Sequence, residues 1–255
     1  METYFIKTFG CQMNYSDSER IATQLEKYGL SAGALAQADL VVVNSCSVRQ
    51  TAEDRVYGFI HNIWKNQPQT KIILTGCLAG RKDVQKRLKN KVDLFVDIKN
   101  FQKDFKNFIS CHPELVEGSN SQKKLDSSTH LVKTRFAQND KNYLKLIPKY
   151  QNNFQAFVPV MTGCNNFCAY CVVPYARGQE ISRPAEEIIK EIRSLIKRGY
   201  KEIVLLGQNV NSYVSPSPVP ARLWRGRGWG EGTSSSHFQG EDRGGVNFSA
   251  LLKKI

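Results

Sequence analysis

Three cysteines stand close together in the second half of the chain. They are Cys164, Cys168 and Cys171 in the segment GCNNFCAYC, with Tyr170 just before the last of them. Structural zinc sites use four protein ligands, and a disulfide would leave one thiol unpaired. A cubane iron–sulfur cluster normally has four thiolate ligands, so three would leave one iron open to a small molecule. The odd number of thiols therefore favours a cluster with one free coordination position.

Three further cysteines follow predicted strands. Cys11, Cys46 and Cys77 are separated by 35 and 31 residues, close to the roughly 30 residues of one βαβ unit. In a parallel sheet they would emerge at the same carboxyl edge, where open α/β sheets bind ligands. Three unrelated buried cysteines remain the alternative. Cys111 lies in a polar segment, and we assign it no role.

Alternating strand and helix patterns fill the first hundred residues. Apolar, β-branched runs predict strands at residues 4–9, 38–45, 70–76 and 92–97, and helical spacing predicts helices at 17–29, 52–64 and 83–89. Helices of this length between strands imply right-handed βαβ crossovers. The fold class predicted for this part is α/β with a parallel sheet.

A second βαβ pattern surrounds the triple-cysteine segment. Residues 153–163 predict a strand that leads into it, residues 183–199 the clearest helix of the chain, and residues 200–213 another strand with its loop. The buried stripe expected for the helix is Ile188, Ile189, Ile192, Leu195 and Ile196. A ligand site after such strands is typical of barrels built from βα repeats.

The chain is strongly basic, with a net charge of +13 and a pI near 9.4. This favours an anionic partner, with nucleic acid as the first candidate, although a lysine-rich solvated surface gives the same charge. Much of the excess lies in Arg81–Lys91. The apolar runs are too short to span a membrane and the N-terminus lacks a signal pattern. We therefore expect a cytoplasmic protein without a membrane partner, in which thiols stay reduced.

Five motifs together resemble one family. They are FGCQMNYSDSE, NSCSVRQTAEDRV, TGCLAG, GCNNFCAYCVVPYARGQEISRP and LLGQNVNSY. Together they resemble the radical S-adenosylmethionine methylthiotransferases over roughly residues 3–109 and 144–214, and again over the last few residues. The sequence CQMN favours the branch that acts on isopentenylated adenosine in tRNA. The alternatives are the branches that act on threonylcarbamoyl-adenosine in tRNA or on a ribosomal protein.

The resemblance implies two [4Fe–4S] clusters. Cys164, Cys168 and Cys171 would hold the first, whose open iron binds S-adenosyl-L-methionine and drives its cleavage to a 5′-deoxyadenosyl radical. Cys11, Cys46 and Cys77 would hold the second, which carries or donates sulfur. The implied reaction is methylthiolation at C2 of N6-isopentenyladenosine at position 37 of tRNA, with electrons from a donor such as a flavodoxin or ferredoxin. We expect the enzyme to be a monomer.

Further site residues follow from the resemblance. Tyr170 is expected near the adenine of S-adenosylmethionine, with an ordinary core aromatic as the alternative. The loop residues Gly207, Gln208 and Asn209 follow the second barrel strand, where the superfamily contacts the cofactor's amino end, although Asn and Gly also serve plain turns. We name no catalytic acid or base, because an aromatic C–H bond offers a side-chain base no acidic proton.

The resemblance also divides the chain. Residues 1–109 would form the N-terminal methylthiotransferase domain, and 110–143 a disordered linker or insertion. Residues 144–255 would begin a radical SAM domain, a partial (βα) barrel with a disordered insertion at about 215–245. The rest of the barrel and the family's C-terminal TRAM domain have no counterpart here, so we expect impaired turnover.

Two classes without this chemistry remain. One is an iron–sulfur electron carrier, which would normally supply all four ligands to its cluster. The other is a non-catalytic RNA-binding module held together by an iron–sulfur cluster or by zinc, which the charge and the two sets of three thiols allow. Iron content and cleavage of S-adenosylmethionine would separate these classes.

Overall fold

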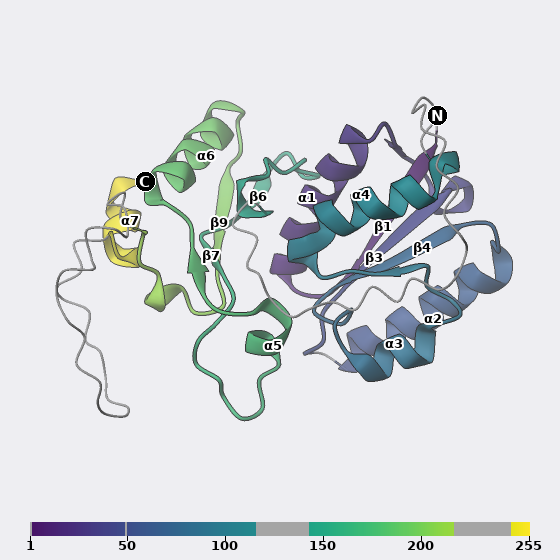
Figure 1. The fold of residues 1–255 in the computed structure, drawn as a ribbon. Helices are drawn as coiled ribbons and strands as arrows, with labels where there is room; N and C mark the ends of the chain where they lie inside the picture. The colour runs from purple at the N-terminus through teal and green to yellow at the C-terminus, as the bar shows by residue number, and fades with distance from the viewer. Residues whose placement is uncertain (1, 49, 116–142, 217–245) are drawn as a thin grey trace.

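The structure is a computed structural model, and it describes residues 2–48, 50–115, 143–216 and 246–255. It contains a larger N-terminal part built on a five-stranded sheet and a smaller C-terminal part built on two parallel strands (Figure 1). None of the helices in these ranges is long and apolar enough to cross a membrane. The predicted α/β class is confirmed.

The larger sheet is entirely parallel, with the strand order β2-β1-β3-β4-β5. Its strands are β1 (Thr3–Phe9), β2 (Ser31–Ala32), β3 (Leu40–Ser45), β4 (Lys71–Gly76) and β5 (Leu94–Phe95). The four predicted strands are present, and the short β2 at one edge was not predicted. Because every pair is parallel, all the carboxyl ends lie along one edge of the sheet.

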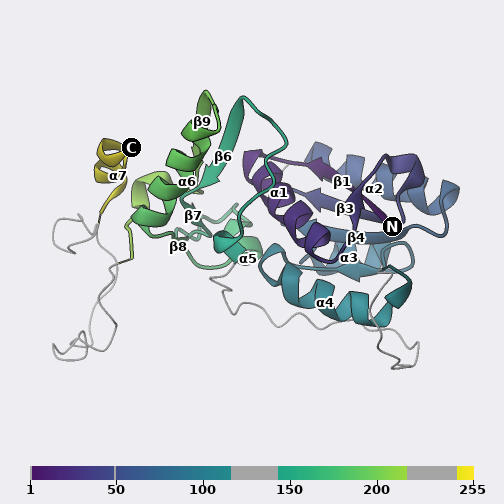
Figure 2. The same cartoon turned by 90° about the horizontal axis from the view of Figure 1, so that it is seen from above.

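Helices cover both faces of this sheet (Figures 1 and 2). Helices α1 (Gln12–Lys27) and α4 (Phe101–Cys111) pack on one face, and α2 (Gln50–Asn66) and α3 (Lys82–Leu88) on the other. The continuous apolar run of β3 serves both cores, because Val42 faces the first pair of helices and Val41 and Val43 face the second. A strand buried on both faces needs such a run.

The N-terminal part continues beyond the predicted boundary at residue 109. The unpredicted helix α4 runs to Cys111, and Leu115 packs into the same core as Phe101, Phe105 and Phe108. These phenylalanines recur at helical spacing and stack on one another, at centroid separations of 5.5 and 6.3 Å. Their spacing was the sequence signal for this helix.

Helix α1 begins at Gln12, earlier than the predicted residue 17. Cys11 is its N-cap, with its backbone N–H 3.2 Å and its Sγ 3.3 Å from Oδ1 of Asn14. A cysteine in this position is not among the usual capping residues. The start of the helix was therefore not visible from residue preferences.

The smaller part is one βαβ unit with a short hairpin. Strand β6 (Gln155–Pro159) pairs in parallel with β9 (Glu202–Leu206), and α6 (Ala185–Lys197) connects them. Between β6 and α6, β7 (Met161–Thr162) pairs antiparallel with β8 (Ile181–Ser182), and α5 (Val173–Arg177) lies between these two strands. Ile188, Ile192 and Leu195 form the buried stripe of α6, with Ile189 partly buried. The prediction for Ile196 was wrong, since it is 55% exposed.

The last described helix, α7 (Phe248–Lys254), inserts Leu251 into the core of the smaller part. Just before it, Val214 and Asn247 form an antiparallel bridge, and the Ser215 N–H donates to the Val246 carbonyl at 2.9 Å. The two ends of the predicted insertion thus lie side by side. The predictions of disorder concern mainly residues 116–142 and 217–245, which lie outside the described residues. Short 3-10 turns occupy Leu35–Gln37, Ile98–Asn100, Pro113–Leu115, Tyr143–Lys145 and Val210–Ser212.

Candidate functional site

The first set of cysteines lies where its spacing predicts. Cys11, Cys46 and Cys77 follow β1, β3 and β4, which are adjacent strands of the sheet. The three thiols therefore occupy one stretch of the carboxyl edge. Their placement is confirmed, and their role as metal ligands stays a prediction.

The thiols of this set interact with one another and with backbone groups. A hydrogen bond with Cys46 lowers the pKa of the Cys11 thiol to about 5, and the same bond together with burial raises the pKa of Cys46. The Val48 N–H lies 3.4 Å from the Sγ of Cys46. Burial raises the pKa of Cys77, and the positive charge of Arg177 opposes that effect. One of the three thiols is thus already favoured as a thiolate.

Two buried asparagines hold the first two cysteine loops together. Asn14 Nδ2 donates to Asn44 Oδ1 at 3.0 Å, and Asn44 Nδ2 donates to the Asn14 carbonyl at 2.8 Å and to Ser18 Oγ at 3.0 Å. Gly76, before Cys77, has φ +85°, and a Cβ there would lie 2.4 Å from Asn44 Oδ1. These residues set the positions of the cysteine loops. Sequence reasoning missed them, although all of them lie within the family motifs.

The second set of cysteines lies in the loop between β7 and α5. Cys164 is buried, Cys168 is exposed and Cys171 is intermediate. The Cys164 N–H donates to the Gly178 carbonyl at 3.1 Å, and the Cys171 N–H to the Cys168 carbonyl at 2.9 Å. The loop is thereby attached at its start to the segment before β8, while its later part faces solvent.

Backbone conformations in this loop are unusual. Gly163 has φ +76°, and a Cβ there would lie 2.1 Å from the carbonyl oxygen of Gln179. Phe167 has φ +44°, a region that residues other than glycine seldom adopt. Tyr170 is 93% exposed, so the alternative of a core aromatic was wrong. Its contact with adenine stays a prediction.

The loop after β9 lies against the strand that leads into the second set of cysteines. A Cβ on Gly207 would lie 2.7 Å from Met161 Cγ in β7 and 2.9 Å from Val210 Cγ1. Glycine therefore permits the close approach of the two segments. Gln208 and Asn209 follow and are partly exposed. The contact of these three residues with a cofactor also stays a prediction.

A buried arginine joins the two cysteine sets. Arg177, in α5, donates from Nε to Cys77 Sγ at 3.2 Å and from Nη2 to Asp17 Oδ2 at 2.7 Å. The side chains of Arg177 and Asp17 are 2% and 0% exposed. The Arg177 carbonyl also accepts a hydrogen bond from Lys99 Nζ. The segment that carries the second set is thus bonded directly to a cysteine of the first. Sequence reasoning missed both Arg177 and Asp17.

The donor atoms of both sets are cysteine thiols, which are compatible with iron–sulfur clusters. Within the described ranges, no three His, Cys, Asp or Glu side chains are placed to hold one ion. Cysteines around a cubane cluster each bind a different iron, so they need not meet at one point. All-thiolate donor sets suit iron–sulfur clusters. Arg177, with its charge beside Cys77, would offset part of the negative charge of such a cluster.

Comparisons with known proteins agree with this geometry. Residues 3–97, with the first set of cysteines, match the model of the uncharacterized protein family UPF0004, and residues 158–219, with the second set, match that of the Radical SAM superfamily. A protein of Lachnoclostridium phytofermentans named tRNA-2-methylthio-N(6)-dimethylallyladenosine synthase is 42% identical over 219 residues, which is 83% of this chain. The chain belongs to the radical SAM methylthiotransferase family.

Other members of the family give the same result. Proteins of the same name from Clostridium botulinum (strain Hall) and Thermoanaerobacter sp. (strain X514) are 39% and 41% identical over 82% of this chain. The alignments cover only 44%, 45% and 43% of the three relatives. The chain thus spans less than half the length of the methylthiotransferases that it matches.

Proposed function

We propose that this chain provides two cluster-binding sites of an enzyme that methylthiolates C2 of N6-isopentenyladenosine at position 37 of tRNA. The observation that carries this proposal is the pair of three-cysteine sets at strand carboxyl ends, linked through Arg177. The names of these relatives support the assignment of this substrate. They do not favour the threonylcarbamoyl-adenosine and ribosomal-protein alternatives, and the radical SAM match does not favour an electron carrier or a zinc module.

Each set of cysteines would hold one [4Fe–4S] cluster. Cys164, Cys168 and Cys171 would hold the cluster that leaves an iron open for S-adenosylmethionine, and Cys11, Cys46 and Cys77 would hold the other. When bound, these groups supply the electron for radical formation and the sulfur. In this proposal Gly207, Gln208 and Asn209 contact the amino end of S-adenosylmethionine, and Tyr170 contacts its adenine.

The chain's own contribution is positioning. Sulfur must reach the carbon from which hydrogen is removed, so the two sites must face each other at a fixed separation. Arg177 would help to fix the distance between the two sites, because its side chain bonds to Cys77 and its helix follows the loop with Cys171. We propose no side-chain acid or base, since the radical removes a hydrogen atom.

The partners follow from the same proposal. The net charge of +13 on the protein would attract the anionic tRNA, and a flavodoxin or ferredoxin would deliver electrons. We propose that the reaction takes place in the cytoplasm and that the chain acts as a monomer.

Anaerobic reconstitution with iron and sulfide tests the proposal. We expect about eight irons per chain, because each cubane holds four, and reductive cleavage of S-adenosylmethionine. Replacing Cys11, Cys46 and Cys77 together by Ala should leave about four irons and keep the cleavage. Replacing Cys164, Cys168 and Cys171 should also leave about four and abolish it. Tight zinc, or a chain without iron after loading, would refute the proposal.

A further inference from the structure

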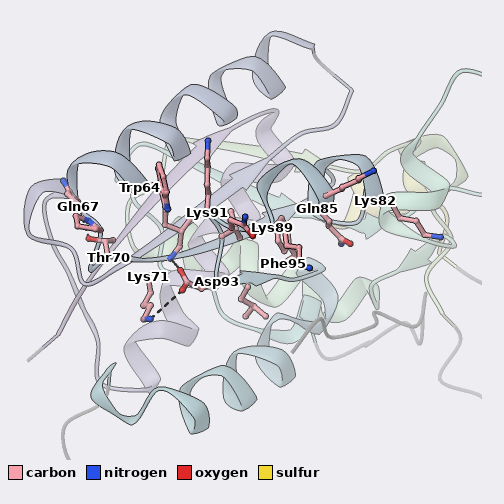
Figure 3. A pocket seen from close by; sticks show the side chains of 16 residues that line it. Trp64, Gln67, Thr70, Lys71, Lys82, Gln85, Lys89, Lys91, Asp93 and Phe95 are labelled. Atoms are coloured by element: carbon pink, nitrogen blue, oxygen red, sulfur yellow. Dashed lines mark hydrogen bonds and ion pairs between the residues drawn. The ribbon is translucent and has the colours of Figure 1, made fainter. Parts of the chain in front are cut away.

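A basic groove lies on the α2–α3 side of the larger sheet, and no cysteine is among the residues that line it. Its volume is about 630 Å³, and it is lined by the end of α2, the turn into β4, α3 and the segment into β5. Figure 3 shows its side chains in a row from Gln67 at one end to Lys82 at the other. No feature of the proposed chemistry uses this groove.

The groove carries positive charge that the protein does not neutralise. Five lysines line it, and Asp93 is the one carboxylate among its lining residues. Asp93 is occupied, because it lies 3.7 Å from Lys71 Nζ and accepts the Ile72 N–H at 2.7 Å. Among the described residues, no carboxylate forms an ion pair with Lys82, Lys86, Lys89 or Lys91.

The spacing of these lysines makes the unpaired charge costly. Lys82, Lys86 and Lys89 fall at i, i+4 and i+7 on and just after α3, so they share one side of the helix. Like charges at this spacing repel one another. The opposite side of α3 buries Val84 and Leu88 in the core. An arrangement that destabilises the free helix is explained if an anion occupies the groove.

An exposed aromatic ring stands among the cations. Trp64 is 47% exposed, and Lys91 Nζ lies 5.4 Å from the centre of its ring. The His61 ring stacks on the Trp64 ring, with a centroid separation of 6.2 Å and an interplanar angle of 28°. Lys91 Nζ is also 3.1 Å from His61 Nδ1. A flat ring beside several lysines suits a ligand that combines negative charge with aromatic bases.

We infer that this groove binds RNA, with the lysines on backbone phosphates and Trp64 under an unpaired base. Lysine charge with an aromatic platform is the usual combination for single-stranded nucleic acid. Lys82, one of the residues that line the groove, follows Cys77 by five residues in the sequence. The inference rests on the proposed function for the identity of the RNA as tRNA. An acidic protein would need the lysines and not the ring, so RNA is the partner that uses both.

The first test measures binding of a fluorescein-labelled RNA hairpin with an unpaired loop to the full chain, by anisotropy at several salt concentrations. Each phosphate contact contributes up to about eightfold at ~0.1 M salt. Changing Lys86→Ala and Lys89→Ala together should weaken binding at least about tenfold and reduce the salt slope by about two. The matched control is Lys103→Ala with Lys106→Ala on α4, at the opposite face of the sheet. This control should bind within about twofold of the parent chain, and circular dichroism checks that both variants are folded.

The second test concerns the ring. Trp64→Leu should weaken binding about fivefold or more, because it removes a stacking platform, and Trp64→Phe should restore most of the affinity. Poly-glutamate of matched charge should compete poorly with the hairpin. Equal competition by poly-glutamate, or equal affinities of the Leu and Phe variants, would overturn the assignment to RNA.

Cluster measurements keep this inference separate from the proposed function. The Lys86/Lys89 variant should retain the iron content and the S-adenosylmethionine cleavage of the parent chain. If the parent chain loads iron and cleaves S-adenosylmethionine but the groove variants bind RNA unchanged, the groove assignment fails alone. If groove-dependent RNA binding is found in a chain that holds no iron, the proposed function fails and the groove assignment stands.

Discussion

Removing the charge of Arg177 should destabilise the whole chain, because its partner would be left buried and unpaired. The Asp17 side chain is 0% exposed, and its contacts are the Arg177 guanidinium and the hydroxyl of Tyr143. Breaking a buried ion pair by removing one partner costs about 3–5 kcal/mol. For a chain of this size that corresponds to a fall of roughly 6–20 °C in the unfolding temperature, at about 2–4 °C per kcal/mol.

The assay is urea unfolding of the cluster-free chain carrying Arg177→Met, followed by circular dichroism. Arg193→Met is the matched control, since Arg193 is exposed on α6 and should change stability by less than about 0.5 kcal/mol. The double variant Asp17→Asn with Arg177→Met should recover part of the loss, because no charge is then buried alone. A loss below about 1 kcal/mol for Arg177→Met would refute the view that this pair joins the two parts.

A second measurement on the same variants reports on the link to the cysteines. Cys77 is 6% exposed and the Arg177 Nε lies 3.2 Å from its sulfur. Arg177→Met removes the positive charge that opposes the raised pKa of Cys77, so it should slow alkylation of Cys77 in the cluster-free chain, measured by mass spectrometry of the modified peptide. Cys111, exposed at the end of α4, is the internal reference and should react at the same rate in all variants.

Three other perturbations have defined outcomes. Burial raises the pKa of Glu19 to about 7; the Gln151 N–H and Arg20 oppose this shift, and the charge of Glu191 adds to it. The folded state therefore holds the proton of Glu19 more tightly than the unfolded state does. The free energy of unfolding should fall by up to about 3 kcal/mol as pH rises from about 4.5 to 7. Urea unfolding across this range should show a flatter profile for Glu19→Gln. Asn44→Ala leaves its partners at the first cysteine loops unsatisfied and should cost about 2–4 kcal/mol in the same assay. Gly163→Ala forces a Cβ to within 2.1 Å of the Gln179 carbonyl and should cost about 1–3 kcal/mol and lower iron incorporation at the second site, whereas Gly58→Ala, with open space around it on α2, should not.

The sequence predicted the parts of the fold that depend on local pattern. The run Leu40–Val43 is buried on both faces, and its unbroken apolar sequence predicted a central parallel strand. The positions of Cys11, Cys46 and Cys77 followed from counting residues after strands. Helix α4 was missed although Phe101, Phe105 and Phe108 recur at helical spacing.

The contacts between the two parts of the chain could not be predicted in this way. Arg177 and Asp17 are separated by 160 residues, and charged side chains are rarely fully buried unless they are paired. Nothing in the composition of either segment marks its charge as buried. The pairing is a consequence of how the two parts pack, which periodicity within one segment does not encode.

Helix α1 shows why the polar residues of this region look misplaced in the sequence. Ser16, Asp17, Glu19 and Arg20 are all buried, although a surface helix would expose one polar face. The reason is that α1 lies between the five-stranded sheet and β6 (Figure 2). Its contacts to the smaller part include Ser16 Oγ to the Phe157 carbonyl at 3.3 Å, and the Lys149 N–H to the Glu19 carbonyl at 3.1 Å.

This helix also explains how one arginine can act on two of the three cysteines of the first set, Cys77 and Cys11. Cys11 caps the start of α1 and Asp17 lies further along it, so Arg177 bonds both to Cys77 and to the helix that Cys11 caps. Movement of α5 relative to the sheet would break both bonds at once and leave Asp17 unpaired. Separating α5 from the sheet therefore costs free energy, and this cost keeps the loop of the second cysteine set close to the edge that carries the first. The packing of the two parts therefore fixes α5, which follows the loop of the second set, against the edge that carries the first.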